Sequence, residues 1–346
     1  MLERSLTAVF IAIAVLALAP LPAAAQSADP DAPRTPWGTP DLQGVWDFRS
    51  LTPLERPEEL GDKAFLTAEE AAALEQEALQ RNEELLHRPA ETATAGGSVD
   101  VREDGSPGFY NNTWLDGGTS TVDSRRTSLI TDPPNGRIPP MTAAAAKRAA
   151  ALAMERRGTA THEPTPGGWI HDLGSMGLQL RCITGFNSGP PMTPGFYNQN
   201  VQIFQTPDEV VLLNEMNHNF RVVPLDGSDT PGLPQWTGSS RAHWDGDTLV
   251  VETRDFLRET SFAFGVTTKH LQVVERFSRP SPDTLLYQVT VDDPTVWQQP
   301  WSYEIPMKWN DQPLYEYACH EGNYGLANIL AGARAQEAAA AERSEQ

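Results

Sequence analysis

The densest group of reactive side chains lies near the end of the chain, in the segment Cys319-His320-Glu321-Gly322-Asn323-Tyr324-Gly325. A histidine beside a carboxylate can be held in one tautomer and can transfer protons near neutral pH. Cys319 is also one of only two cysteines in the chain. The segment is therefore either held in place by the fold or part of a working site.

Further candidate acid–base groups lie at the ends of predicted strands. Glu215 and His218 are three residues apart at a strand-to-turn transition, and His243, His270 and His320 also lie at or beside strand ends. Because the strand ends of a meander can meet at one opening, we expect several of these side chains to converge. The alternative is that each histidine is a hydrogen-bonded group that closes the end of a hairpin.

These observations give one set of candidate catalytic residues: His218, His320, Glu321, Glu215, Arg241, His243 and Tyr324. In this hypothesis His218 or His320 is the general acid or base, and Arg241 stabilises an anion. Glu321 or Glu215 orients the histidine. Glu252 and Glu275 lie within predicted strands, where they form either an inward acid–base pair or outward ion pairs with arginines, depending on strand register.

Several classes of chemistry have no signature in this sequence. There is no G-x-S-x-G elbow, no H-E-x-x-H, no cysteine pair with metal-ligand spacing, and no phosphate-binding or dinucleotide-binding glycine motif. We therefore expect neither a cofactor nor a metal, although His218, His243 and His320 leave a metal site open. A net charge of −20 disfavours nucleic acid and anionic membranes as partners.

The start of the chain has the pattern of a secretory signal peptide over residues 1–25. An apolar run over residues 6–21 precedes Ala23-Ala24-Ala25, the small residues expected before a cleavage site. No later stretch is long and apolar enough to predict a membrane span. We therefore expect a periplasmic or secreted protein, cleaved near Ala25. In such an oxidising compartment Cys182 and Cys319 are expected to form a disulfide, with a free thiol or metal ligand as the alternative.

The pattern after residue 200 predicts successive antiparallel strands. The expected strands span 201–206, 209–215, 220–225, 240–245, 248–254, 269–278, 284–291 and 302–308, and residues 315–319 add a possible further strand. Earlier, residues 41–46 predict a strand. Thr67 and Glu70 form a capping box that opens a helix over 67–86, and residues 142–157 predict a second helix.

The expected fold is mainly β: an antiparallel meander that forms a barrel or a sandwich, with N-terminal helical and loop insertions and a short C-terminal helix. The predicted organisation is a flexible tail over residues 26–40, one β-rich domain over 41–334 with a helical insertion at about 60–160, and a disordered tail over 335–346. The final helix is expected over residues 323–334.

Two resemblances accompany these patterns. Gly44-x-Trp46 on the first strand resembles the opening of lipocalin-like (calycin) barrels, which implies a ligand cup whose closed end is plugged by the tryptophan. The phrases PDLQGVW, HWDGDTLVVET and CHEGNYG resemble a large group of exported bacterial proteins of unassigned function. That second resemblance implies export and one integrated fold, and it brings no catalytic residues.

Two functions therefore stand as hypotheses. The first is an exported, cofactor-independent acid–base enzyme, such as a lyase, isomerase, dehydratase or hydrolase, that acts on a small molecule at the mouth of a β-barrel. The second is a periplasmic lipocalin-like protein that binds an apolar or glycosidic ligand without catalysis.

Overall fold

The computed structural model describes residues 33–87, 116–155, 178–179, 181–225, 232–257 and 268–344. The expected signal peptide (1–25) and the first part of the expected tail (26–40) lie outside these residues. Within them, no helix combines the length and the apolar character that crossing a membrane requires.

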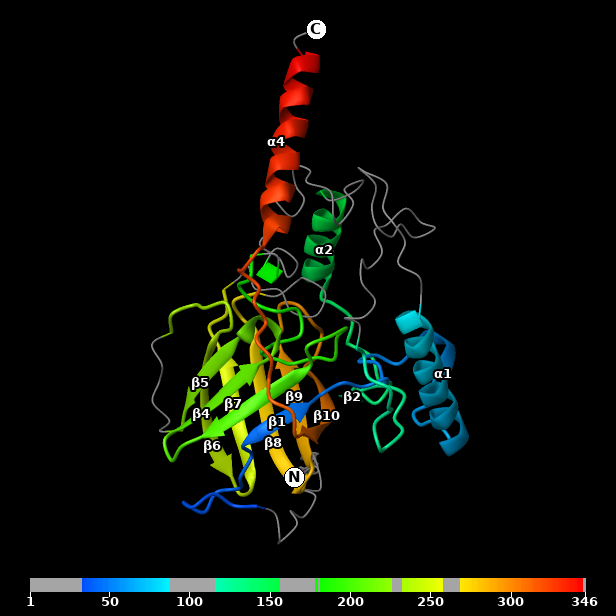
Figure 1. The fold of residues 1–346 in the computed structure, drawn as a ribbon, viewed down its shortest axis with the longest axis vertical. Helices are drawn as coiled ribbons and strands as arrows, with labels where there is room; N and C mark the ends of the chain where they lie inside the picture. Colours follow the sequence, from blue (N-terminus) through cyan, green and yellow to red (C-terminus); the bar gives the residue numbers. More distant parts are fainter. Residues whose placement is uncertain are drawn as a thin grey trace, which may run out of the picture.

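The fold is mainly β, as the sequence predicts, and its ten strands form one antiparallel sheet (Figure 1). The strands are β1 (Gly44–Asp47), β2 (Ile130–Asp132), β3 (Asn200–Gln205), β4 (Glu209–Asn214), β5 (Phe220–Pro224), β6 (Ser239–Asp245), β7 (Thr248–Arg254), β8 (Gln272–Ser281), β9 (Thr284–Asp292) and β10 (Trp301–Asn310). Their order is β5-β4-β3-β1-β10-β9-β8-β7-β6, and β2 pairs with β10. The two end strands, β5 and β6, are not joined by backbone hydrogen bonds, so the sheet is not closed.

The helices lie outside the sheet (Figure 1). They are the α-helices α1 (Ala68–His87), α2 (Ala143–Glu155) and α4 (Tyr324–Ser344) and the short 3₁₀ helices η1 (Glu58–Leu60) and η3 (Met216–His218). The predicted capping box forms, because the Glu70 carboxylate accepts the Thr67 N–H and the Thr67 hydroxyl accepts the Glu70 N–H.

Two expectations near the C-terminus are wrong. Residues 315–319 form no strand, since the Tyr317 N–H donates to a histidine side chain and not to a neighbouring strand. The final helix does not end at Arg334 but continues through Ser344. Its second half is rich in alanine and glutamate, which have high helix propensity, so the predicted disordered tail is helical as far as Ser344.

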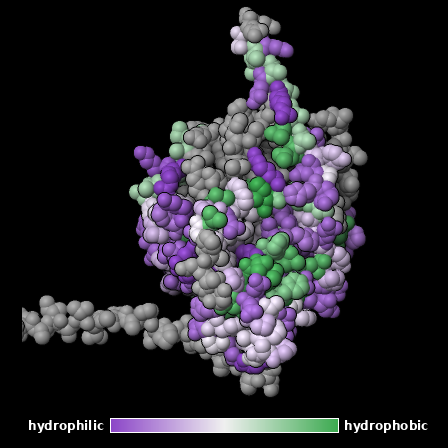
Figure 2. Space-filling view, turned by 90° about the vertical axis from the view of Figure 1, so that its left-hand side faces the viewer, coloured by the Kyte–Doolittle hydropathy of each residue, from purple (hydrophilic) through white to green (hydrophobic). Residues whose placement is uncertain are grey.

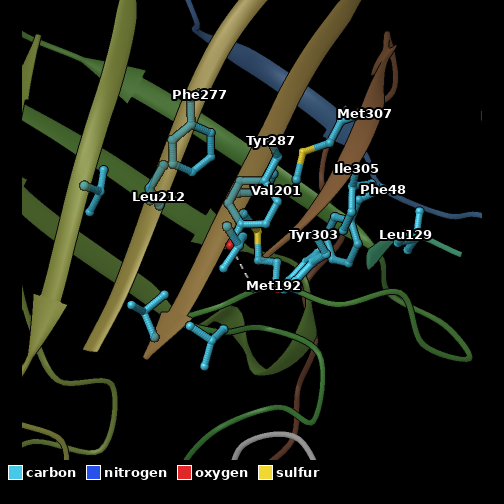
Figure 3. Packing of buried hydrophobic residues seen from close by; sticks show 14 of the residues in the cluster. Phe48, Leu129, Met192, Val201, Leu212, Phe277, Tyr287, Tyr303, Ile305 and Met307 are labelled. Atoms are coloured by element: carbon cyan, nitrogen blue, oxygen red, sulfur yellow. Dashed lines mark hydrogen bonds between the residues drawn. The ribbon is translucent and has the colours of Figure 1, made fainter. Parts of the chain in front are cut away.

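Inward and outward side chains alternate along the strands as the sequence predicts. Leu285, Tyr287, Val289 and Val291 of β9 are buried, whereas the side chains between them are more exposed. The buried side chains of β3, β4 and β7 to β10 join those of β1 in one core (Figure 3). Residues 183–199 cover part of this core and insert Met192, whose backbone N–H and C=O bond the hydroxyls of Tyr287 and Tyr303.

Aromatic side chains gather around Trp46 of β1. This side chain is fully buried, its ring nitrogen donates to the Leu42 carbonyl at 2.9 Å, and Arg279 lies 5.0 Å from its ring centroid. Trp309 packs edge-on against Trp46 and leaves no room for a side chain at residue 44, where an added Cβ would lie 2.2 Å from its ring. Gly44 also has a φ of +123°, so both the space and the backbone there require glycine.

Apolar side chains also lie on the outward face of β3, β4 and β5. Phe204, Val211 and Val222 are paired across these strands, and Phe220 of β5 is 65% exposed. Hydrophobic residues gather on the side of the molecule that lies at the left of Figure 1 (Figure 2). An exposed apolar patch of this kind is uncommon on proteins that have no interaction partner.

The two ends of the sheet are joined by side chains. Arg221 of β5 forms a two-point ion pair with Glu275 of β8, with distances of 2.6 and 2.8 Å, and its guanidinium also lies 3.3 Å from the Ser240 hydroxyl of β6. The Tyr287 hydroxyl donates to the same Glu275 carboxylate at 2.8 Å. Arg221 therefore links β5 to β6 and β8 across the seam that backbone hydrogen bonds leave open.

Both charges of this pair are buried, since Arg221 is 7% exposed and Glu275 is fully buried. Burial alone would lower the pKa of Arg221, but the carboxylate of Glu275 more than offsets this effect, so the pKa is raised. Burial and then the Glu275 charge raise the pKa of the Tyr287 hydroxyl well above its usual value. The arginine therefore stays charged, and the tyrosine stays a hydrogen-bond donor.

The terminal segment, residues 311–323, leads from β10 to α4 and is tied to the rest of the fold by the expected disulfide. Cys182 and Cys319 are 137 residues apart in sequence, with a Cα–Cα distance of 5.6 Å. The Tyr317 N–H donates to the His218 side chain at 2.8 Å, and the Gln179 side chain donates to the Tyr317 hydroxyl at 3.4 Å. The disulfide and these bonds place the terminal segment against η3.

Glu275→Gln is expected to destabilise the protein by about 3–5 kcal/mol, because it leaves Arg221 as a buried charge without a counter-charge. Glu252→Gln is the matched control. Glu252 pairs with Arg241 on the outward face, where both side chains are about a third exposed, so a loss below about 1 kcal/mol is expected. Urea unfolding of the three proteins measures both values, and equal losses would contradict a closing role for Arg221 and Glu275.

Replacing both cysteines (Cys182→Ala, Cys319→Ala) is expected to release the terminal segment and to lower stability by up to about 5 kcal/mol, since the cross-link closes a long loop. Hydrogen exchange of the Tyr317 amide should accelerate at least tenfold relative to amides in β8 and β9. Unchanged exchange at Tyr317 would show that the bonds to His218 and Gln179 hold the segment without the disulfide.

Candidate functional site

The predicted acid–base residues Glu215 and His218 lie in the connection between β4 and β5. We call residues 214–221, which include η3, the β4–β5 corner. Asn217 and His218 have φ values of 56° and 47°, a left-handed conformation that is uncommon for residues other than glycine. Two such residues in succession are costly, and strained backbone of this kind is concentrated at functional sites.

His218 is oriented by the terminal segment. Its Nδ1 accepts the backbone N–H of Tyr317 at 2.8 Å, a bond between residues 99 positions apart. Because that N–H can only donate, Nδ1 carries no proton, and the proton of the neutral ring lies on Nε2. The histidine therefore presents an N–H donor, and the same bond prevents Nε2 from acting as a base.

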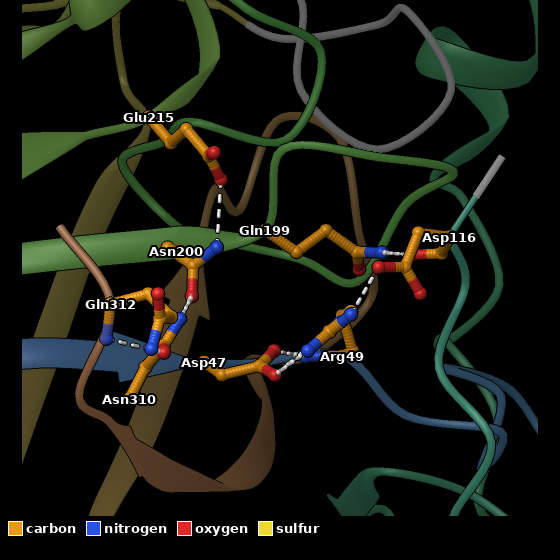
Figure 4. A network of polar contacts seen from close by, with 8 residues as sticks. All are labelled: Asp47, Arg49, Asp116, Gln199, Asn200, Glu215, Asn310 and Gln312. Carbon is orange, nitrogen blue, oxygen red and sulfur yellow. Dashed lines mark hydrogen bonds and ion pairs between the residues drawn. The ribbon is translucent and has the colours of Figure 1, made fainter. Parts of the chain in front are cut away.

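Glu215 directly precedes η3 in the same corner and is 8% exposed. One oxygen of its carboxylate accepts a hydrogen bond from the Asn200 side chain at 2.8 Å, and Asn200 in turn accepts one from Asn310 at 3.0 Å (Figure 4). Asn310 also accepts the Gln312 N–H at the start of the terminal segment. Glu215 is thus linked through two asparagines to the segment that contacts His218.

A second network of polar side chains lies near these asparagines and connects β1 to residue 116 (Figure 4). Arg49 pairs with both Asp47 and Asp116, and the Gln199 side chain donates to the Asp116 carbonyl at 2.7 Å. The Asp47 carboxylate, followed by that of Asp116, raises the pKa of Arg49 above its usual value, and burial offsets part of the rise. Each of these residues bonds at least one other member of the network, so the network serves to hold the loops.

The other reactive residues of the terminal motif lie on the surface beyond the disulfide. His320, Glu321 and Tyr324 are exposed, the last by 75%. Gly322, with a φ of +68°, turns the chain toward α4. These residues therefore follow closely after Tyr317, whose backbone contacts His218, but their own side chains face solvent.

Arg241 and His243 lie elsewhere, on the outward face of β6. Arg241 pairs with Glu252 of β7 at 2.9 Å, and His243 is exposed next to the β6–β7 turn. Ser240, at the opposite end of β6, is the residue that approaches the β4–β5 corner through Arg221. The structure thus brings Glu215 and His218 together with the Cys319 segment and leaves Arg241 and His243 apart from them.

Sequence patterns did not point to two residues that define this site, Tyr317 and Arg221. Tyr317 acts through its backbone, so it carries no local signal. Arg221 has the buried position of an alternating strand, which is an unusual place for an arginine. That alternation was the one sequence signal available for it.

Within the part of the chain that the structure describes, no group of three or more histidine, cysteine, aspartate or glutamate side chains is arranged to hold a metal ion. No family model matches the chain, and neither the curated proteins nor the solved structures searched contain a match.

Proposed function

We propose that the protein is an exported acid–base enzyme that removes a proton from the carbon next to a carbonyl group, as isomerases and lyases, including dehydratases, do. The site is the β4–β5 corner with the terminal segment over it. The observation that carries the proposal is the bond from Tyr317 N–H to His218 Nδ1, because it makes the histidine a neutral donor.

His218 takes the role of an electrophile. A neutral imidazole whose Nε2–H points at a carbonyl oxygen stabilises the negative charge that develops there when a neighbouring proton leaves. The left-handed backbone at residues 217 and 218 and the bond to Tyr317 hold the ring before substrate arrives. Such preorganisation lowers the barrier because the donor need not reorient during the reaction.

Glu215 takes the role of the base, since His218 cannot accept a proton on Nε2. Asn200 donates to one of its carboxylate oxygens and leaves the other for the substrate. The carboxylate accepts the proton, the C–H electron pair forms a C=C bond, and the carbonyl electrons move to the oxygen facing His218. Return of the proton to another carbon gives an isomer, and departure of a leaving group gives the lyase product.

The expected signal peptide and the Cys182–Cys319 disulfide support an exported enzyme, because disulfides persist in oxidising compartments. A second candidate is a lipocalin-like ligand-binding protein without catalysis. The buried Trp46 and the inward aromatic side chains of β8 to β10 favour it, as they would surround an apolar ligand in a curled sheet.

An exchange assay tests the enzyme without knowledge of its substrate. A panel of small aldehydes, ketones, keto acids and esters is incubated with the protein in D₂O, and loss of α-proton signals is followed by NMR. Wild type should catalyse exchange of at least one compound. Glu215→Gln should reduce the exchange rate about 10²- to 10⁴-fold, the range for loss of a general base.

Two His218 variants separate the roles of the ring nitrogens. His218→Asn keeps an acceptor for the Tyr317 N–H and tolerates a positive φ, but it lacks the Nε2–H donor, so a 10²- to 10³-fold loss of exchange is expected. His218→Gln places an amide N–H near the Nε2 position and should be less impaired. His87→Asn, on the exposed end of α1, is the matched control and should match wild type.

The same assay decides between the two candidates. If the His218→Asn and Glu215→Gln variants still bind a panel compound but no longer catalyse its exchange, the result supports the enzyme. Saturable binding by wild type with no exchange of any compound contradicts the enzyme and favours the binding protein.

A further inference from the structure

The outward side of β3, β4 and β5 carries a compact group of apolar side chains. Phe204, Val211 and Val222 form one row across the three strands, and Leu213 and Phe220 form the next row on β4 and β5. All five occupy outward positions of alternating strands, and we call them the apolar face. Figure 2 shows hydrophobic residues gathered on the side of the molecule that carries β4 and β5.

The apolar face is open to solvent. Phe204, Phe220 and Val222 are 42%, 65% and 49% exposed, whereas the residues next to them on the same strands are buried in the core. Contact with an apolar partner would remove this surface from water, which is favourable. The apolar face therefore favours an occupant that is itself apolar.

The candidate acid–base site lies at one end of this face. Val211, Leu213 and Glu215 follow one another at every second position, so Glu215 comes next after the apolar side chains of β4. Its carboxylate accepts a hydrogen bond from Asn200, which has an outward position on β3. Glu215 therefore continues the apolar face, about 7 Å along the chain from Leu213 and about 13 Å from Val211.

The apolar side chains of β5 lead to the same end. Phe220 is the first residue of β5 and follows His218 by two positions. The terminal segment contacts the corner here, since the Tyr317 N–H donates to His218. A molecule whose reacting group lies at Glu215 and His218, and whose remainder extends away from the terminal segment, therefore passes over the apolar face.

The charges on this side disfavour an anionic occupant. The outward positions of β3, β4 and β5 carry no lysine or arginine, and they include Glu209 at the end of the face opposite Glu215. These two carboxylates repel a further negative charge. The net charge of −20 also disfavours a second copy of the chain or an anionic lipid surface as the occupant.

We infer that the apolar face binds the hydrocarbon chain of the substrate of the Glu215–His218 site, and that this substrate is a neutral carbonyl compound with an apolar chain. The inference rests on the proposed acid–base function and narrows its substrate class. Phe220 and Val222 are then specificity-determining residues, because each CH₂ group that lies over them is removed from water.

The test compares methyl ketones of increasing chain length in the α-proton exchange assay. A fully buried CH₂ group strengthens binding about fourfold, so about twofold for each CH₂ is expected on an open face. The value of kcat/KM should rise about tenfold or more from butan-2-one to octan-2-one, mainly through a lower KM. The anion 7-oxooctanoate ends the same chain in a carboxylate near Glu209 and should lose this gain.

Two variants test the residues of the face. Phe220→Ala and Val222→Thr should each reduce the preference for octan-2-one over butan-2-one about threefold or more, because each removes apolar surface. Phe65→Ala is the matched control. Phe65 is 54% exposed but lies beside Arg126, before α1, so its replacement should leave the wild-type preference.

A second readout requires no turnover. In the Glu215→Gln protein, which lacks the proposed base, octan-2-one should shift the methyl NMR signals of Val211, Leu213 and Val222 saturably. Such shifts without exchange by wild type would refute the acid–base function but support the binding of an apolar chain at this face.

Two results would overturn the inference and leave the acid–base function standing. The first is exchange by wild type that does not depend on the chain length of the ketone. The second is exchange by wild type together with methyl signals of the apolar face that octan-2-one leaves unchanged.

Discussion

The buried ion pair between Arg221 and Glu275 is the interaction on which the rest of the structure depends. The sheet has two end strands, β5 and β6, that share no backbone hydrogen bonds. The pair joins β5 to β8, and the same arginine bonds the Ser240 hydroxyl of β6. A buried pair costs desolvation energy on both sides, and it is tolerated here because Tyr287, Ser240 and Thr253 supply further hydrogen bonds. Such a pair gives less net stability than its geometry suggests, but it strongly specifies which strands meet.

Because the Arg221–Glu275 pair specifies which strands meet, it also determines where the β4–β5 corner lies. Arg221 is the second residue of β5, directly after the strained turn that carries His218, so the ion pair attaches this turn to the opposite wall of the sheet. From the outside, the disulfide and the Tyr317 N–H hold the terminal segment against the same turn. The corner is thus held from two sides, which allows two consecutive left-handed residues to persist.

Much of the fold follows from local patterns in the sequence. The strands after residue 200, the capping box at Thr67 and the disulfide between the two cysteines were predictable, because each depends on periodicity, spacing or a choice of one partner. The face of the sheet toward which Glu275 points was not predictable, because it depends on strand register. Its partner Arg221 also lies on a strand that is distant in sheet order. The role of His218 was assigned as acid or base from residue type, whereas its Nδ1 partner is a backbone N–H 99 residues away that leaves no mark in the sequence.

The proposed reaction requires His218 to be a neutral donor whose proton lies on Nε2. The most direct measurement is the pair of ring ¹⁵N chemical shifts of His218 in the folded protein at neutral pH. The expected result is a signal of the unprotonated type for Nδ1 and of the protonated type for Nε2, with Nδ1 coupled across the hydrogen bond to the Tyr317 amide. A protonated Nδ1, whether in the other tautomer or in the imidazolium ion, would contradict it.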